Sequence, residues 1–144
     1  SDEGVGVHVV RVLSDRGVCP DGVEIVDAGP AGMKLLHLIA HRRKVVLVDC
    51  ARMNAIPGTL RRFTPSGVKT IKALAGFSAH EGDLLKVIDL SSELGEAPEQ
   101  TVIFGIEPES VEPGDRLSTV LQANLDHYVD EIVREVTEQV VRHA

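Results

Sequence analysis

The stretch Val45-Val46-Leu47-Val48-Asp49 is an unbroken aliphatic run, mostly β-branched, that ends on a carboxylate. Such a run, without polar alternation, is typical of a strand buried on both faces of a parallel sheet. Ligands of open α/β sheets bind beyond the carboxyl ends of the strands. Asp49 is therefore a candidate functional residue, although an aspartate at a strand end can also serve only as a helix cap or a turn former.

Strand and helix patterns alternate on both sides of this run. Further strands are predicted over residues 23–28 and 102–106, and two short ones over 60–63 and 68–73, joined by a hairpin turn. Apolar residues at helical spacing predict helices that begin near Ser1, Pro30, Ser78 and Ser118. The alternation predicts a three-layer α/β/α sandwich with a mainly parallel sheet.

Length and composition predict a single domain over residues 1–144, with a core of aliphatic side chains, because the chain is 43% hydrophobic and only 3% aromatic. The net charge of -7 argues against nucleic acid and anionic membranes as partners. No apolar stretch approaches the roughly 20 residues that span a bilayer, and no apolar signal core opens the chain, so we expect a cytoplasmic protein. Cys19 and Cys50 lack an evident activating base, and neither is assigned as a nucleophile.

Three potential metal ligands lie where the predicted fold brings chain segments together. Glu3 lies at a helix start, Asp49 at a strand end, and His80 in the first turn of a helix opened by the capping box Ser78-Ala79-His80-Glu81. Helix starts and strand carboxyl ends meet at one edge of a parallel sheet, so the three can converge. Two carboxylates and one imidazole suit a divalent transition ion. Taken singly, Glu3 could be a helix-dipole cap and His80 a surface histidine.

The order of several short motifs resembles the nickel-iron hydrogenase maturation endopeptidases. The resemblance covers nearly the whole chain, and the order and spacing of the motifs carry it more than any one of them. The motifs are Asp2-Glu3-Gly4-Val5-Gly6, Val48-Asp49, Pro57-Gly58-Thr59-Leu60, Ser78-Ala79-His80-Glu81, Ile106-Glu107-Pro108 and Leu117-Ser118.

The resemblance implies both an activity and a metal site. The family cleaves a C-terminal extension from the hydrogenase large-subunit precursor once nickel has been inserted. Its metal ligands map here to Glu3, Asp49 and His80. Nickel is expected to arrive with the precursor as the recognition signal, so the isolated enzyme need not hold a metal. The reaction implied is metal-guided peptide hydrolysis, with these three residues as its catalytic groups.

Two departures from the family pattern stand out. Members begin with a strand and a Gly-x-Gly-Asn turn before the first acidic motif, so we expect a first strand that is missing from this chain. After Asp27 members usually have a Gly-Thr turn, whereas this chain has Ala28-Gly29-Pro30-Ala31-Gly32. The resemblance still implies that Asp27 helps to shape a loop that binds the substrate.

Two other function classes stay open at this point. A non-enzymatic nickel-handling or assembly module could use the same three residues to bind the precursor without cutting it. A phosphoacceptor receiver domain would also have acids at a helix start and a strand end, but it needs a hydroxyl residue and a lysine at the ends of later core strands. The strand at 102–106 is followed instead by Glu107-Pro108, which argues against a receiver domain.

Overall fold

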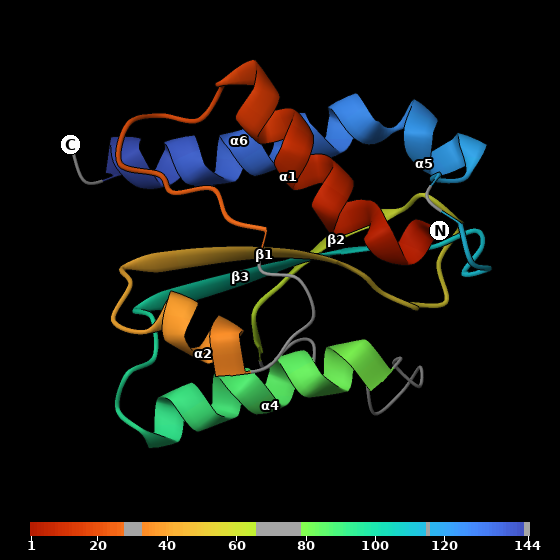
Figure 1. Cartoon of the computed structure of the whole chain (residues 1–144). Helices are drawn as coiled ribbons and strands as arrows, with labels where there is room; N and C mark the ends of the chain where they lie inside the picture. The colour runs from red at the N-terminus through yellow and green to blue at the C-terminus, as the bar shows by residue number, and fades with distance from the viewer. Residues whose placement is uncertain (28–32, 66–78, 115, 143–144) are drawn as a thin grey trace.

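The computed structural model describes residues 1–27, 33–65, 79–114 and 116–142. Within these residues, three strands form one sheet between two layers of helices (Figure 1). The central strand β3 (Gln100–Ile106) pairs in parallel with β1 (Lys44–Cys50) and antiparallel with β2 (Leu60–Phe63). The α/β/α layering agrees with the sequence prediction, but the sheet is mixed rather than mainly parallel. A short loop leads from β1 to β2, and a parallel β2 would need a crossover of a dozen or more residues.

Helices cover both faces of the sheet. A 3-10 turn, η1 (Asp2–Gly4), leads into α1 (Val5–Arg16). On the same face lie α5 (Thr119–Ala123) and α6 (Leu125–Arg142), and on the opposite face lie α2 (Met33–Ile39) and α4 (Ala79–Glu93) (Figure 1). No helix among the described residues is long and apolar enough to cross a bilayer.

The apolar run of β1 contributes side chains to two hydrophobic cores, one on each face of the sheet. Its residues Val46 and Val48 pack against the cluster under α1, α5 and α6, whereas Val45 and Leu47 pack against the cluster under α2 and α4. Successive side chains of a strand point to opposite faces, so a strand between two helical layers needs apolar residues at every position. This is the physical reason for the unbroken run in the sequence.

Two sequence predictions about secondary structure are wrong within the described residues. Residues 23–27 form no strand, and the single helix expected near the C-terminus is divided into α5 and α6 at Asn124. The amide Nδ2 of Asn124 donates to the carbonyl of Val120 at 2.7 Å, a side-chain bond that competes with helical geometry. The strand predicted over 68–73 lies outside the described residues.

Candidate active site

Glu3 is exposed in η1, and η1 packs against the end of β1. The approach is close because Gly6 has no side chain: a Cβ there would lie 2.4 Å from the carbonyl oxygen of Val48. That separation is far below a normal contact, so only glycine allows the start of α1 to lie on the strand. Glu3 is thereby held near the carboxyl end of β1, the strand that contains Asp49.

Asp49 is half-buried near the end of β1, opposite Gly105 of β3 in the strand register. Its Oδ1 accepts a hydrogen bond from the backbone N–H of Cys50 at 2.8 Å. Alternation along β1 puts Asp49 at the same face as Val45 and Leu47, which pack toward α2 and α4. The strand end predicted from the sequence is therefore confirmed, and it is turned toward the layer that contains α4.

His80 lies in the first turn of α4, as the capping box predicts. Its side chain is outside the described part of the structure, so the meeting of Glu3, Asp49 and His80 stays a prediction. Asp27 is exposed and follows residues 23–26, which form neither a helix nor a strand. Its role in a substrate loop also stays a prediction, because residues 28–32 lie outside the described residues.

The donor set suits a transition ion, since two carboxylates and an imidazole are ligands that such ions accept. Among the described side chains, no group of three or more His, Cys, Asp or Glu residues is close enough to hold a metal ion. Glu3 and Asp49 are thus the two described members of the predicted set.

Asp2 is a structural carboxylate that the sequence analysis does not distinguish from a helix-dipole acid. It is fully buried, and it accepts hydrogen bonds from the backbone N–H groups of Glu109, Ser110 and Ser118 and from the Ser118 hydroxyl, at 2.7 to 3.0 Å. Burial raises the pKa of Asp2, but these donors outweigh it and hold the pKa below its ordinary value. Asp2 therefore fixes η1, and with it Glu3, to the loop after β3.

Glu107 is a second buried carboxylate beside the site. Its Oε1 accepts from the backbone N–H groups of Met53 at 2.7 Å and Ala55 at 3.0 Å, in the loop that follows Asp49. Sequence reasoning places Glu107 after a core strand but gives it no role. The donors to Asp2 and Glu107 lie more than 50 positions away in the chain, and no short-range pattern could identify them.

Cys19 is not poised for nucleophilic catalysis. Burial raises the pKa of its thiol, which favours the unreactive protonated form. This agrees with the sequence analysis for Cys19, which is not assigned as the attacking group.

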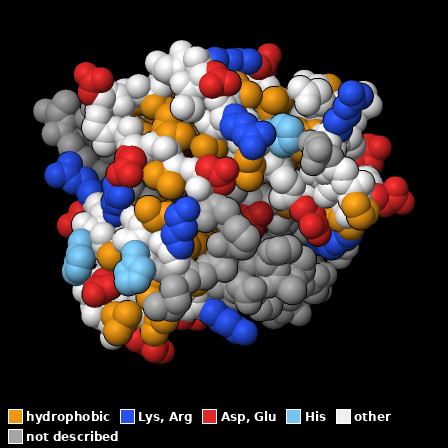
Figure 2. Space-filling model, in the orientation of Figure 1, with side chains coloured by type: hydrophobic (Ala, Val, Ile, Leu, Met, Phe, Trp, Pro, Cys, Tyr) orange, Lys and Arg blue, Asp and Glu red, His pale blue; other side chains and the backbone are white. Residues whose placement is uncertain are grey.

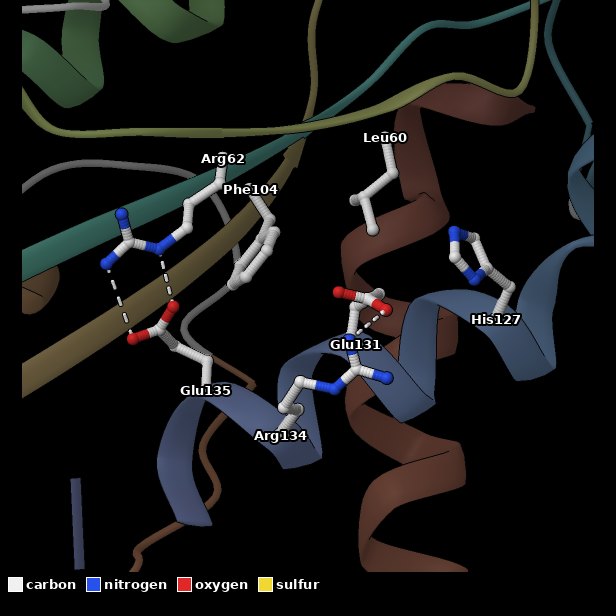
Figure 3. Close-up of a pocket in the computed structure, with 7 residues that line it drawn as sticks. All are labelled: Leu60, Arg62, Phe104, His127, Glu131, Arg134 and Glu135. Carbon is white, nitrogen blue, oxygen red and sulfur yellow. Dashed lines mark hydrogen bonds and ion pairs between the residues drawn. The ribbon is translucent and has the colours of Figure 1, made fainter. Parts of the chain in front are cut away.

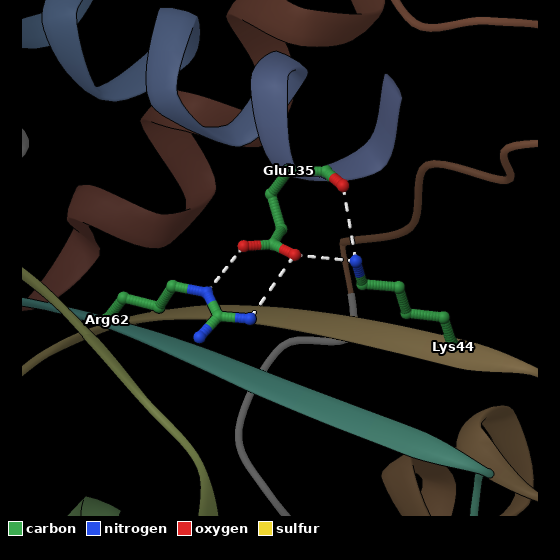
Figure 4. Close-up of polar contacts among 3 residues, drawn as sticks. All are labelled: Lys44, Arg62 and Glu135. Atoms are coloured by element: carbon green, nitrogen blue, oxygen red, sulfur yellow. Dashed lines mark hydrogen bonds and ion pairs between the residues drawn. The ribbon is translucent and has the colours of Figure 1, made fainter. Parts of the chain in front are cut away.

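A separate polar cavity of about 590 Å³ lies between α6 and β2 (Figure 3). Its acids are paired with its cations: Arg134 with Glu131 at 3.2 Å, and Arg62 with Glu135 at 2.5 Å. Glu135 also binds Lys44 of β1 at 2.6 Å, and both side chains are buried (Figure 4). Charges of both signs are likewise interspersed over the face of the molecule drawn in Figure 2. We assign a structural role to the ion cluster formed by Lys44, Arg62 and Glu135.

Comparisons with known proteins point in one direction. Residues 7–135 match the family model described as hydrogenase maturation protease. The hydrogenase 2 maturation protease of Escherichia coli K12 is 32% identical over 143 residues, which are 98% of this chain and 86% of that protein. The hydrogenase expression/formation protein HoxM of Cupriavidus necator is 29% identical over 131 residues, which are 90% of this chain and 65% of HoxM.

Solved structures give the same picture. The hydrogenase maturating endopeptidase HybD from E. coli superposes with a TM-score of 0.86 at 30% sequence identity, covering 96% of this chain and 86% of that one. A hydrogenase 2 maturation peptidase from a Thaumarchaeota archaeon superposes with a TM-score of 0.67 at 28% identity, covering 94% and 89%.

Proposed function

This chain belongs to the hydrogenase maturation protease family, and we propose that it carries out the family reaction with Glu3, Asp49 and His80. It is an endopeptidase of hydrogenase maturation that processes the C-terminus of the large subunit. The non-enzymatic alternative gains no support, because the matching family model and the similar structures are those of proteases and peptidases.

The substrate that we propose is the nickel-loaded large-subunit precursor, in which nickel is cargo rather than a resident cofactor of this chain. Carboxylate oxygens of Glu3 and Asp49 and an imidazole nitrogen of His80 would complete the coordination of that ion. The ion then fixes the position of the scissile peptide bond relative to the enzyme, so that binding of the nickel ion determines which peptide bond is cleaved. A precursor without nickel lacks this anchor.

The reaction is peptide hydrolysis. Water adds to the scissile carbonyl carbon, the C–N bond breaks, and a proton passes to the departing amine. The products are a new carboxylate on the large subunit and the free C-terminal peptide. The carboxylates and imidazole that we assign to the site are groups that can hold or move the protons of this addition.

The observation that carries this proposal is the close seating of η1 on the end of β1, where Gly6 meets the carbonyl of Val48. It holds an exposed carboxylate of one motif beside a strand end that carries the carboxylate of another. The first turn of α4, which contains His80, lies in the opposite helical layer, and we propose that it supplies the imidazole.

The experiment is incubation of the chain with nickel-loaded and with nickel-free precursor, followed by mass measurement of the precursor. We expect loss of a C-terminal peptide from the nickel-loaded form alone. Cleavage of both forms would contradict the nickel-guided mechanism, and cleavage of neither would contradict the function.

The first strand expected from the sequence also has a place in the fold. β1 pairs with β3 along one edge, and a groove of about 740 Å³ follows β1, lined by Lys44 and Val46 on one side and by Val23 and Ile25 on the other. We infer that residues 1–144 form a single domain and that a further strand would fit here, beside β1. Adding an apolar strand segment before Ser1 should slow hydrogen exchange of the β1 amides; unchanged exchange would contradict this placement.

We also propose that the protein acts in the cytoplasm, as expected from the sequence.

A further inference from the structure

The loop between β1 and β2, residues 51–59, begins two positions after Asp49 and is anchored in the core at its base. Ala51 and Met53 are each 4% exposed. They pack over Gly105 of β3, where an added Cβ would lie 2.9 Å from the Cβ of Ala51 and 3.2 Å from the sulfur of Met53. A glycine in the central strand thus makes room for the base of a surface loop.

Glu107 fixes the same loop through both its side chain and its backbone. Besides the bonds from Met53 and Ala55 to its carboxylate, its carbonyl accepts from the N–H of Gly58 at 2.8 Å. Its own N–H donates to the carbonyl of Thr59 at 2.9 Å. Glu107 is 7% exposed, so these bonds are shielded from competing water.

The turn at the end of the loop is closed by further bonds. The N–H and the hydroxyl of Thr59 both donate to the carbonyl of Ile56, at 3.0 and 2.6 Å. The hydroxyl of the buried Tyr128 donates to the carbonyl of Gly58 at 2.6 Å. Gly58 has a φ of +92°, a conformation that other residues rarely adopt. The backbone on either side of Ile56 is therefore held in one conformation.

This rigid turn projects an apolar side chain into solvent. Ile56 is 80% exposed, more than any other exposed large hydrophobic side chain that the structure describes; Leu94 follows at 54%. A single exposed apolar residue needs no explanation on an ordinary surface. Here, buried groups from the segment directly after β3 and from α6 fix the backbone that carries it, beside the strand end of the proposed site. A preorganised contact of this kind binds without the cost of ordering a loop.

We propose that the turn 55–59 is a docking element for the large-subunit precursor, with Ile56 as its anchor in an apolar depression next to the precursor's C-terminal extension. The inference rests on the proposed function and adds a specificity-determining residue to it. Ile56 would act on binding of the precursor and not on the chemical step, because no group of its side chain can move a proton or hold an ion.

The test compares Ile56→Ser and Ile56→Leu with the parent chain in the processing assay with nickel-loaded precursor. Losing the burial of one aliphatic side chain should raise KM by about tenfold or more in Ile56→Ser, with kcat unchanged. Ile56→Leu should keep the parent KM. Leu94→Ser is the matched control, since Leu94 is also exposed but directly follows the C-terminal end of α4, and it should leave KM unchanged.

The outcomes separate the inference from the function. If the parent chain cleaves and Ile56→Ser cleaves with the same KM, the docking role is wrong while the endopeptidase function stands. If Ile56→Ser loses kcat rather than affinity, Ile56 is not a docking residue. If the parent chain neither binds nor cleaves the precursor, the proposed function fails and this inference fails with it. Thermal unfolding of each variant checks that the fold is retained.

Discussion

Single residues of this protein fall into those that face the substrate and those that hold them in place. Asp2 and Glu3 are neighbours in sequence, yet Asp2 is fully buried and Glu3 is exposed. The buried carboxylate binds backbone of the loop after β3, and the exposed one is free to face a ligand. Two adjacent acids thus have different roles because the one-turn helix η1 directs them to opposite sides.

Replacing His80 with alanine should abolish processing while leaving the fold intact. The prediction rests on its place in the first turn of α4 and on its assignment as the only nitrogen ligand of the proposed set. Mass measurement of nickel-loaded precursor gives the activity, and circular dichroism gives the fold. His37→Ala in α2, where the histidine is exposed, is the control and should process normally. Normal cleavage by His80→Ala would remove this residue from the site.

Replacing Asp2 should destabilise the protein even when the shape of the side chain is kept. Both carboxylate oxygens of Asp2 accept hydrogen bonds. Asp2→Asn replaces one of these oxygens with an amide nitrogen, so that an N–H group would face another donor. We expect a loss on the order of 3 kcal/mol in the free energy of unfolding, measured by urea denaturation. Glu3→Gln is the control and should change stability by less than about 0.5 kcal/mol. Equal stability of Asp2→Asn and the parent would contradict the role of Asp2 in fixing η1 to the loop after β3.

At the scale of elements, the arrangement of α1 on β1 decides whether the proposed site can form. Gly6→Ala would push a Cβ against the carbonyl of Val48, which belongs to the backbone and cannot rotate away. We expect a loss of about 1 to 3 kcal/mol in stability and a drop in processing, because η1 and Glu3 move with α1. Gly4→Ala, whose added Cβ would have its nearest neighbour at 4.0 Å, should keep both. Two alanine variants with the same stability would refute the close approach.

The sequence best predicts those helices and strands whose hydrophobic pattern has a single structural cause. The apolar runs in β1 and β3 are continuous because both faces of each strand are buried, and both strands are found where expected. The sequence does not predict the antiparallel pairing of β2 with β3, since strand pairing depends on partners far along the chain. Residues 23–27 alternate like a strand but have no strand assigned.

The candidate site shows the same limit. Glu3, Asp49 and His80 could be named from motif order, and the structure gives the placement of the first two and the helix of the third. Asp2 and Glu107 could not be named, because their roles depend on donors from distant loops. Acids that bind nearby side chains leave a pattern in the sequence, whereas acids that bind distant backbone leave none.

For the whole molecule, one ion cluster ties the sheet to its longest helix. Glu135 of α6 binds Lys44 at the start of β1 and Arg62 of β2, so both strands that flank β3 are joined to one side chain (Figure 4). Removing one member of a buried cluster leaves its partners without compensation. The cluster should therefore contribute to global stability and not to the chemistry of the site.

Acid should weaken the protein through this cluster. Burial raises the pKa of Glu135, but the bonds and charges of Arg62 and Lys44 outweigh it and hold the pKa below the ordinary 4.5. A carboxyl whose pKa is lower in the folded than in the unfolded state stabilises the fold fully above 4.5, and that contribution disappears as pH falls through the lowered folded value. Urea unfolding of the parent at pH 7 and at decreasing pH below 4.5 should show this loss.

Glu135→Gln isolates the contribution of that carboxylate. It should cost about 3 kcal/mol at pH 7, since Lys44 stays buried beside a neutral group, and its stability should fall less steeply than that of the parent below pH 4.5. Glu131→Gln, which breaks only the more exposed pair with Arg134, should change stability by less than about 1 kcal/mol and keep the parent's acid dependence. If Glu135→Gln and the parent lose stability in parallel below pH 4.5, the acid sensitivity comes from other carboxylates, and the cluster does not hold the two strands to α6 as the structure implies.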